Sequence, residues 1–157
     1  MSLVAGASFL TTFAGVLSGV DIVAHIAKNS SADGFARWAA DPACAVTLAE
    51  HRQGSAPVGY SLLCRPDLPI PTGSTDIELR RIYTVPNAAG TGLGAALMAR
   101  AIDDARALGH TRMLLGVLAT NTRATAFYKR QGFAVAGQRQ YLVGETLHDD
   151  LVFARSI

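Results

Sequence analysis

Apolar residues recur at helical spacing in the first quarter of the chain and at strand spacing after it. Residues 3–13 and 20–28 each place apolar side chains three or four positions apart, which predicts two helices. Ser30 and Ser31 supply capping residues for a third short helix, and Asp41-Pro42 ends it. The side chains expected to face the core from residues 3–13 are Leu3, Phe9, Leu10 and Phe13.

Strand patterns follow from residue 45 onward. Residues 45–51 and 57–65 flank a polar turn, so they predict an antiparallel hairpin. Residues 76–84 alternate, with Ile77, Leu79, Arg81 and Tyr83 on one predicted face. The continuously apolar residues 113–119 predict a strand buried on both faces. Two last strands, 133–143 and 146–154, are expected to meet at a tight turn of Gly144 and Glu145.

A glycine-rich segment joins the alternating strand to a further helix. Gly90, Gly92 and Gly94 stand at every second position, directly before helical spacing begins at Leu93. Glycines there expose backbone N–H groups at a helix N-terminus, where phosphate oxygens bind. The predicted buried face of this helix comprises Leu93, Ala96, Leu97, Arg100, Ala101, Ile102 and Ala105, with Leu108 closing it. A last short helix is expected over residues 122–130.

This order of elements predicts an α+β (mixed α/β) fold around one sheet. The 157 residues, half of them apolar and 17% charged, suit a single domain over 1–157 with a proper core. The net charge of +2 is spread without a basic run, which argues against nucleic acid or an anionic membrane as partner. The apolar N-terminus lacks the basic start of a signal peptide and is short for a membrane span, so we expect a packed helix and a cytoplasmic protein.

Cysteine and histidine positions predict no metal site. Cys44 and Cys64 do not form a C-x-x-C pair, and we expect two reduced, buried thiols. The histidines are scattered without paired spacing, and we expect His110 and His148 to be structural.

The glycine segment alone fits more than one phosphate-bearing ligand. Gly90, Gly92 and Ala95 satisfy G-x-G-x-x-A, the dinucleotide fingerprint. The strand before it is too polar for the first strand of a doubly wound sheet, however, and no acid follows the next strand to bind a ribose. A nicotinamide-binding protein therefore stays a distant alternative. The absence of a Gly-Lys-Ser/Thr triplet excludes a P-loop.

A second motif restricts the choice of ligand. It has the pattern N-x-x-A-x-x-F-Y-x-x-x-G-F and runs from Asn121 to Phe133. Together with ELRRIYT and GTGLGAALM, it resembles the GNAT (GCN5-related N-acetyltransferase) superfamily over residues 45–157. The wording FYKRQGF and the DDLV ending look closest to PaiA-like polyamine acetyltransferases. The resemblance implies one central, mostly antiparallel, splayed sheet flanked by helices, with acetyl-CoA as cosubstrate and no metal.

The resemblance also implies roles for individual residues. The backbone of Ile82, Tyr83 and Thr84 would pair with the pantetheine arm, and Asn121 would hydrogen-bond near it. Tyr128 would lie by the thioester and protonate the departing thiolate, while Glu78 would act as base, directly or through water. Arg123 fits an exposed helix arginine better than a phosphate ligand. The pyrophosphate would be held by Ala89, Gly90, Thr91, Gly92, Leu93 and Gly94, mainly through their amides.

Two departures from the family pattern stand out. The pyrophosphate loop usually opens with Arg or Gln, and Ala89 occupies that position here. The strand that usually precedes the N-terminal helix is not recognisable, so either the family's first strand is missing or the sequence is truncated.

The sequence thus predicts an acetyltransferase acting on a primary amine by direct attack. The alternative is a catalytically silent acyl-CoA-binding or regulatory module on the same fold. The acceptor stays open among polyamine, antibiotic, amino acid and protein amine. Acidic residues expected near the acceptor groove, which would suit a polyamine, are Asp76, Glu78, Asp149 and Asp150. A homodimer is expected from the resemblance alone.

Overall fold

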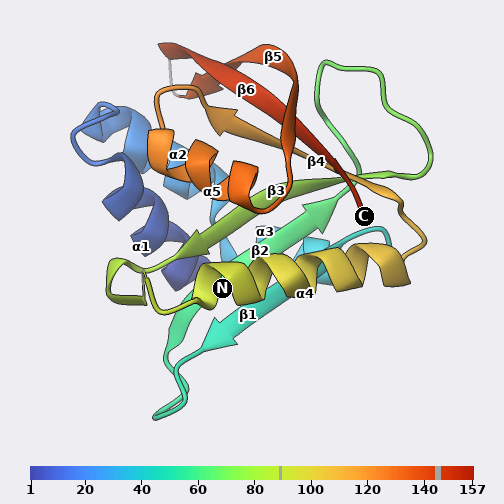
Figure 1. Cartoon of the computed structure of the whole chain (residues 1–157). Helices are drawn as coiled ribbons and strands as arrows, with labels where there is room; N and C mark the ends of the chain where they lie inside the picture. The colour runs from blue at the N-terminus through green and yellow to red at the C-terminus, as the bar shows by residue number, and fades with distance from the viewer. Residues whose placement is uncertain (89, 144–145) are drawn as a thin grey trace.

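The fold is described from a computed structural model, which covers residues 1–88, 90–143 and 146–157. The order of helices and strands is the one expected from the sequence (Figure 1). The predicted turn at Gly144 and Glu145 lies outside the described residues. The elements are α1 (Ser2–Phe13), α2 (Gly19–Asn29), α3 (Ala32–Ala40), β1 (Ala45–Glu50), β2 (Pro57–Cys64), β3 (Asp76–Thr84), the 3-10 helix η1 (Pro86–Ala88), α4 (Leu93–Ala107), β4 (Arg112–Leu118), α5 (Thr122–Arg130), β5 (Ala134–Val143) and β6 (Thr146–Ser156).

The strands form one mixed sheet in the order β1-β2-β3-β4-β6-β5. Neighbouring strands run antiparallel except β3 and β4, which are parallel. Their pairing extends only from Asp76 opposite Arg112 to Glu78 opposite Leu114. Beyond that point β3 and β4 diverge, so the sheet is splayed in its middle. The predicted fold class, with a mostly antiparallel sheet flanked by helices, is confirmed.

Helices cover the two faces of the β1–β3 half of the sheet (Figure 1). On one face α4 buries Met98, Ala101 and Ile102 against a core that includes Leu63 and Phe153. On the other face α1 and α3 pack on β2 through Val4, Phe35 and Tyr60. The N-cap expected at Ser31 is present, because its hydroxyl accepts a hydrogen bond from the Gly34 N–H at 3.1 Å.

The buried faces of α1 and α4 differ in part from the predicted ones. Leu3 and Leu10 are 76% and 49% exposed, because α1 turns small residues such as Ala5 and Ser8 to the sheet, where they allow close approach. In α4, Arg100 points to solvent and pairs with Asp104 on the next turn. Leu108 is also exposed, since it follows the last helical residue.

A β-bulge in β3 reverses the side-chain alternation predicted for that strand. In the pairing with β2, Leu62 lies opposite Arg81 but Leu63 lies opposite Leu79, so Arg80 is an extra residue. Ile77 and Leu79 therefore share the α4-side core with Ile82, whereas Tyr83 packs on the opposite side. The strict alternation was wrong, because a period-two pattern cannot anticipate an inserted residue.

The two cysteines face each other across the β1–β2 pair. Cys44 directly precedes β1 and Cys64 ends β2, and both thiols are free, with their Sγ atoms 3.0 Å apart. Burial raises the pKa of the Cys64 thiol well above its usual range. In the described part of the chain, no helix has both the length and the apolar character that a membrane crossing would need.

Candidate active site

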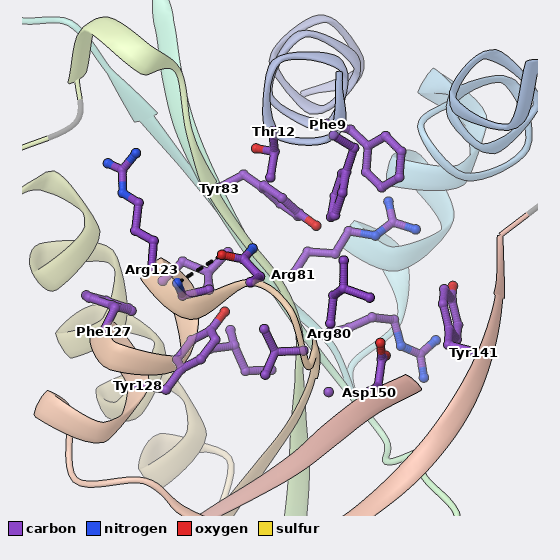
Figure 2. A pocket seen from close by; sticks show the side chains of 18 of the residues that line it. Phe9, Thr12, Arg80, Arg81, Tyr83, Arg123, Phe127, Tyr128, Tyr141 and Asp150 are labelled. Atoms are coloured by element: carbon purple, nitrogen blue, oxygen red, sulfur yellow. Dashed lines mark hydrogen bonds between the residues drawn. The ribbon is translucent and has the colours of Figure 1, made fainter. Parts of the chain in front are cut away.

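A cavity of about 1510 Å³ lies where β3 and β4 diverge. One end, which we call the cofactor end, is bordered by the glycine segment before α4 and by α5. The other, the acceptor end, is bordered by α1, α2 and β5. Figure 2 shows side chains from both ends at this hollow, with Tyr128 of α5 pointing toward the side on which Tyr83 of β3 and Phe9 of α1 lie.

The glycine segment leads into α4 with an exposed backbone. Gly90 and Gly92 have φ of 81° and 87°, in the left-handed region that side chains disfavour. Gly92 is the N-cap of α4, which has no side-chain cap and no acidic residue in its first turn. By helix geometry, the N–H groups of Leu93 and Gly94 have no partner within the helix. This end of α4 can therefore hold an anionic group through backbone amides alone.

Side chains of the glycine segment contribute little to the cavity. The Thr91 hydroxyl donates to the Ala88 carbonyl at 2.7 Å and so stabilises the turn. Thr91 and Leu93 do not border the cavity themselves. The prediction for Ala89 falls outside the described residues. Gly94 faces Phe127, whose ring would lie 3.8 Å from an added Cβ, so a small residue there lets α5 approach α4.

The diverging part of β3 offers a second set of backbone groups. Ile82, Tyr83 and Thr84 pair with β2 along one edge and border the cavity along the other. Because β4 pairs with β3 only as far as Glu78, the backbone beyond that residue has no partner strand on this side among the described residues. An extended ligand could hydrogen-bond there as an added strand would.

The helix α5 places Asn121 and Tyr128 on the cavity wall. The Asn121 side chain accepts from the Ala124 N–H at 3.1 Å and so caps α5, leaving its amide NH₂ as a donor. The Tyr128 ring packs against Phe133 and Phe153. Burial raises the pKa of Tyr128 to about 12, so the phenol is protonated at neutral pH.

Glu78 borders the cavity but its carboxylate already has partners. It is 4% exposed, and its Oε2 atom accepts from the Asp67 N–H at 2.8 Å. The same oxygen lies 3.3 Å from Arg80 Nη2. The carboxylate is thus fixed in place at the point where β3 and β4 separate, with Oε1 left to accept a further proton or hydrogen bond.

A second ion pair, between Arg139 and Asp150, borders the cavity from β5 and β6. Arg139 Nε and Nη2 both lie 3.1 Å from Asp150 Oδ2. Burial raises the pKa of Asp150, while Arg139 opposes that shift. The guanidinium lies on the backbone of Gly116 in β4, where a Cβ atom would come within 2.5 Å of Nη2. His148, expected to be structural, also borders the cavity, and its Nε2 atom is buried without a hydrogen-bond partner.

Several aromatic side chains and Arg81 form part of the wall of the acceptor end. Phe9 stacks on His25 with ring centroids 4.1 Å apart, and Tyr83 stacks on Tyr60 at 5.9 Å. Arg81 lies over the Trp38 ring, 4.8 Å from its centroid. Burial, followed by the charge of Arg81, lowers the pKa of His25 to about 4, so this ring is neutral at pH 7.

Of the acidic residues predicted near the acceptor groove, Glu78 and Asp150 border the cavity and the other two do not. Asp76 lies away from the cavity, because it pairs with Arg112 at 2.6 Å and accepts from the Gly73 N–H. Asp149 does not border the cavity either, since its neighbour Asp150 points inward instead. Placing both near the acceptor groove was wrong.

Sequence reasoning missed most of the acceptor end. Arg80, Arg81 and Arg139 border the cavity, as does the exposed Arg123. The adjacent Arg80 and Arg81 were a visible signal, but only the bulge explains how both approach the cavity. Among the described residues, no group of three His, Cys, Asp or Glu side chains is arranged to hold a metal ion.

Comparison with known proteins gives consistent matches. The family model described as the acetyltransferase (GNAT) family matches residues 21–133. An uncharacterised N-acetyltransferase of Mycobacterium bovis is 35% identical over 136 residues, which are 87% of this chain and 82% of that protein. A mycothiol acetyltransferase of Beutenbergia cavernae is 42% identical over 82 residues, but these are 52% of this chain and 27% of that protein.

Among solved structures, the PaiA N-acetyltransferase of Thermoplasma acidophilum, crystallised with coenzyme A, has the same fold. It superposes with a TM-score of 0.80 at 21% identity and covers 99% of this chain and 90% of its own. A GCN5-related N-acetyltransferase structure from Rhodopseudomonas palustris gives a TM-score of 0.74 at 16% identity, over 99% and 87% of the two chains.

Proposed function

The chain belongs to the acetyltransferase (GNAT) family, and from that premise we propose that it transfers the acetyl group of acetyl-CoA to a primary amine. The observation that carries the proposal is the junction of three features at one cavity. These are the uncapped N-terminus of α4, the open edge of β3 and the protonated Tyr128 phenol. Solved relatives bind coenzyme A or acetyl-CoA, which is consistent with such a cavity.

The residues present fit acetyl-CoA, which would supply the activated acetyl group as a thioester. Backbone amides from Gly90 to Gly94 would hold its pyrophosphate at the N-terminus of α4. The backbone of Ile82, Tyr83 and Thr84 would bind the pantetheine arm as an added strand, with the Asn121 amide as a further donor. The absence of acidic residues in the first turn of α4 favours the negative charge.

The chemistry requires this chain to accept one proton and to donate another. An ammonium must lose a proton before its nitrogen can attack, and Glu78 is the carboxylate at the point of divergence that could accept it, directly or through water. The departing sulfur must gain a proton, and Tyr128 is the acid for that step. Because burial disfavours the phenolate, Tyr128 regains its proton readily after each turnover.

The test is release of free CoA thiol from acetyl-CoA on addition of amines, with mass spectrometry of the acetylated product. Amine-dependent thiol release with a matching product supports the proposal. Binding of acetyl-CoA without release across a broad amine panel contradicts it.

One observation also favours the alternative function, a catalytically silent acyl-CoA-binding or regulatory module. The Glu78 carboxylate accepts from the Asp67 N–H and pairs with Arg80, which are interactions that a purely structural carboxylate would make. Glu78→Gln distinguishes the two functions. If Glu78→Gln loses turnover but binds acetyl-CoA as tightly as the wild type, Glu78 is the base. If the wild-type protein itself binds acetyl-CoA but has no turnover, the chain is a silent binding or regulatory module.

Three further expectations stay predictions. The single acetyltransferase domain over 1–157 should unfold in one cooperative transition. A homodimer would show as twice the chain mass in light scattering. The cytoplasmic location is tested by fractionating cells that express the protein.

A further inference from the structure

The two buried carboxylates on the cavity wall are both taken up by ion pairs, and the third carboxylate there, Asp67, is exposed and forms no ion pair with Arg81. Glu78 is paired with Arg80, and Asp150 is paired with Arg139. Arg81 also borders the cavity, yet no carboxylate of the described residues lies within ion-pair distance of it. One half-buried cation is therefore left without a counter-ion in this part of the cavity.

The surroundings of Arg81 fix its guanidinium without neutralising it. One Nη1–H donates to the carbonyl of Asn29 at the end of α2, and the Trp38 ring covers one face. A carbonyl and a ring face carry only partial charges, so the full positive charge remains. The guanidinium has further N–H donors along its edge, in the planar fork that matches a carboxylate.

The neighbouring titratable groups respond to this positive charge. Burial lowers the pKa of His25, and the charges of Arg81 and then Lys28 lower it further. Arg81 also opposes the burial that raises the pKa of Tyr60 to about 12. Lys28 and His25 border a smaller cavity of about 380 Å³ between α2 and β5, adjoining the acceptor end through His25. The potential here favours an anion and disfavours a second cation.

We infer that the acceptor amine of this protein also carries a carboxylate, and that Arg81 binds this carboxylate at the acceptor end. The inference rests on the proposed acetyl transfer and names its acceptor as an amino-acid-like zwitterion. A polyamine fits poorly, because Arg81 repels its distal ammonium and the two buried carboxylates on the cavity wall, Glu78 and Asp150, are already paired. The aromatic wall of Phe9, Tyr60 and Tyr83 suits an apolar chain between the two charged ends.

The experiment compares matched acceptors that differ only in the group at the far end, with spermidine added as a longer polyamine. The ω-amino acids 4-aminobutyrate and 6-aminohexanoate are tested against butylamine and hexylamine, and against diaminobutane and spermidine, at saturating acetyl-CoA. We expect the amino acid to exceed its alkylamine at least about tenfold in kcat/KM, as one charge-assisted hydrogen bond allows, and the diamine to be poorest. Equal rates, or a preference for spermidine, would overturn the inference.

Arg81→Gln identifies the residue responsible. The variant should raise KM for 6-aminohexanoate about tenfold to a hundredfold and leave hexylamine within about twofold. Arg81→Lys should restore part of the preference, because it keeps the charge but loses the fork. Arg52→Gln, in the exposed β1–β2 turn, is the matched control and should change neither value. Equal losses for both acceptors in Arg81→Gln would indicate a merely structural arginine.

A binding measurement separates failure of this inference from failure of the proposed function. Because it uses the wild-type protein, it also tests the inference if Arg81→Gln does not fold. Calorimetry on the CoA-saturated wild-type protein compares 6-acetamidohexanoate with the neutral N-hexylacetamide. Tighter binding of the carboxylate without any turnover would retain the anion site and reject the transferase. Turnover of amines with no preference for the carboxylate, in rate or in binding, would reject only the anion site.

Discussion

Replacing Gly116 with alanine should destabilise the protein, although alanine is ordinarily the better strand residue. The Gly116 backbone does not have a positive φ, so alanine causes no backbone strain. Its Cβ atom, however, would lie 2.5 Å from Arg139 Nη2 and 2.7 Å from Cζ. The guanidinium must therefore move, and it is the hydrogen-bond partner of the buried Asp150.

The expected cost follows from two opposing effects. Weakening a hydrogen bond to a charged group costs about 1.5–3 kcal/mol, whereas glycine in a strand interior costs about 0.5–1 kcal/mol relative to alanine. The net loss in the free energy of unfolding is about 0.5–2.5 kcal/mol. For a chain of this size, that corresponds to a Tm lower by about 1–10 °C.

The loss should also depend on pH in a defined direction. Burial already raises the pKa of Asp150, and Arg139 opposes that shift. Moving the Arg139 guanidinium away in Gly116→Ala therefore raises the pKa of Asp150 further. A raised carboxyl pKa means that the folded state holds the proton more tightly than the unfolded chain does. Stability then falls as pH rises from about 3.9, the unfolded value, through the folded pKa. The deficit of Gly116→Ala should therefore be smaller near pH 4 than at pH 7.

Urea unfolding of the wild type and of Gly116→Ala measures this deficit. Gly73→Ala is the matched control, because that glycine has an ordinary φ and nothing within 4 Å of an added Cβ. It should be neutral or stabilising by up to about 1 kcal/mol. In an Asp150→Asn background, Gly116→Ala should cost clearly less, since the buried charge is gone. A Gly116→Ala protein as stable as the wild type at pH 7 would refute the reasoning.

Three further predictions follow from the site and its supports. Tyr128→Phe should lower kcat about a hundredfold or more with acetyl-CoA affinity nearly unchanged in calorimetry; an unaltered kcat would exclude Tyr128 as the acid. Asn121→Ala should cost about 1 kcal/mol in urea unfolding through loss of the Ala124 cap, whereas Asn121→Ser should keep most of it; equal losses would refute the cap. The hydrogen bond from Arg112 lowers the pKa of Asp76 in the folded protein. The stability that this ion pair contributes is therefore fully present above about pH 3.9, the unfolded pKa, and is lost as pH falls through the lower folded pKa. Asp76→Asn should therefore cost more at pH 7 than at pH 3, and a pH-independent cost would contradict this.

Local patterns predicted the cofactor end well. Gly90 and Gly92 lie in a turn directly before a helix, as expected, and α4 and α5 begin where the sequence placed them, at Leu93 and Thr122. These features depend on residues within one loop or one helix turn. Local sequence was therefore sufficient.

The acceptor end could not be predicted in the same way. Its wall combines Phe9 of α1, Arg81 of β3 and Tyr141 of β5, which are far apart in sequence (Figure 2). The bulge at Arg80 also changes which β3 side chains share a face. The sequence suggested that Asp76 binds the acceptor, but its carboxylate pairs with Arg112, which lies 36 residues further along the chain. Such pairings depend on the register between strands.

The most direct test of the proposed function is calorimetric titration of the purified protein with acetyl-CoA, followed by thiol release when an amine is added to the same sample. We predict saturable binding at one site per chain and amine-dependent release of CoA with an acetylated product. No detectable binding of acetyl-CoA or CoA would contradict the account.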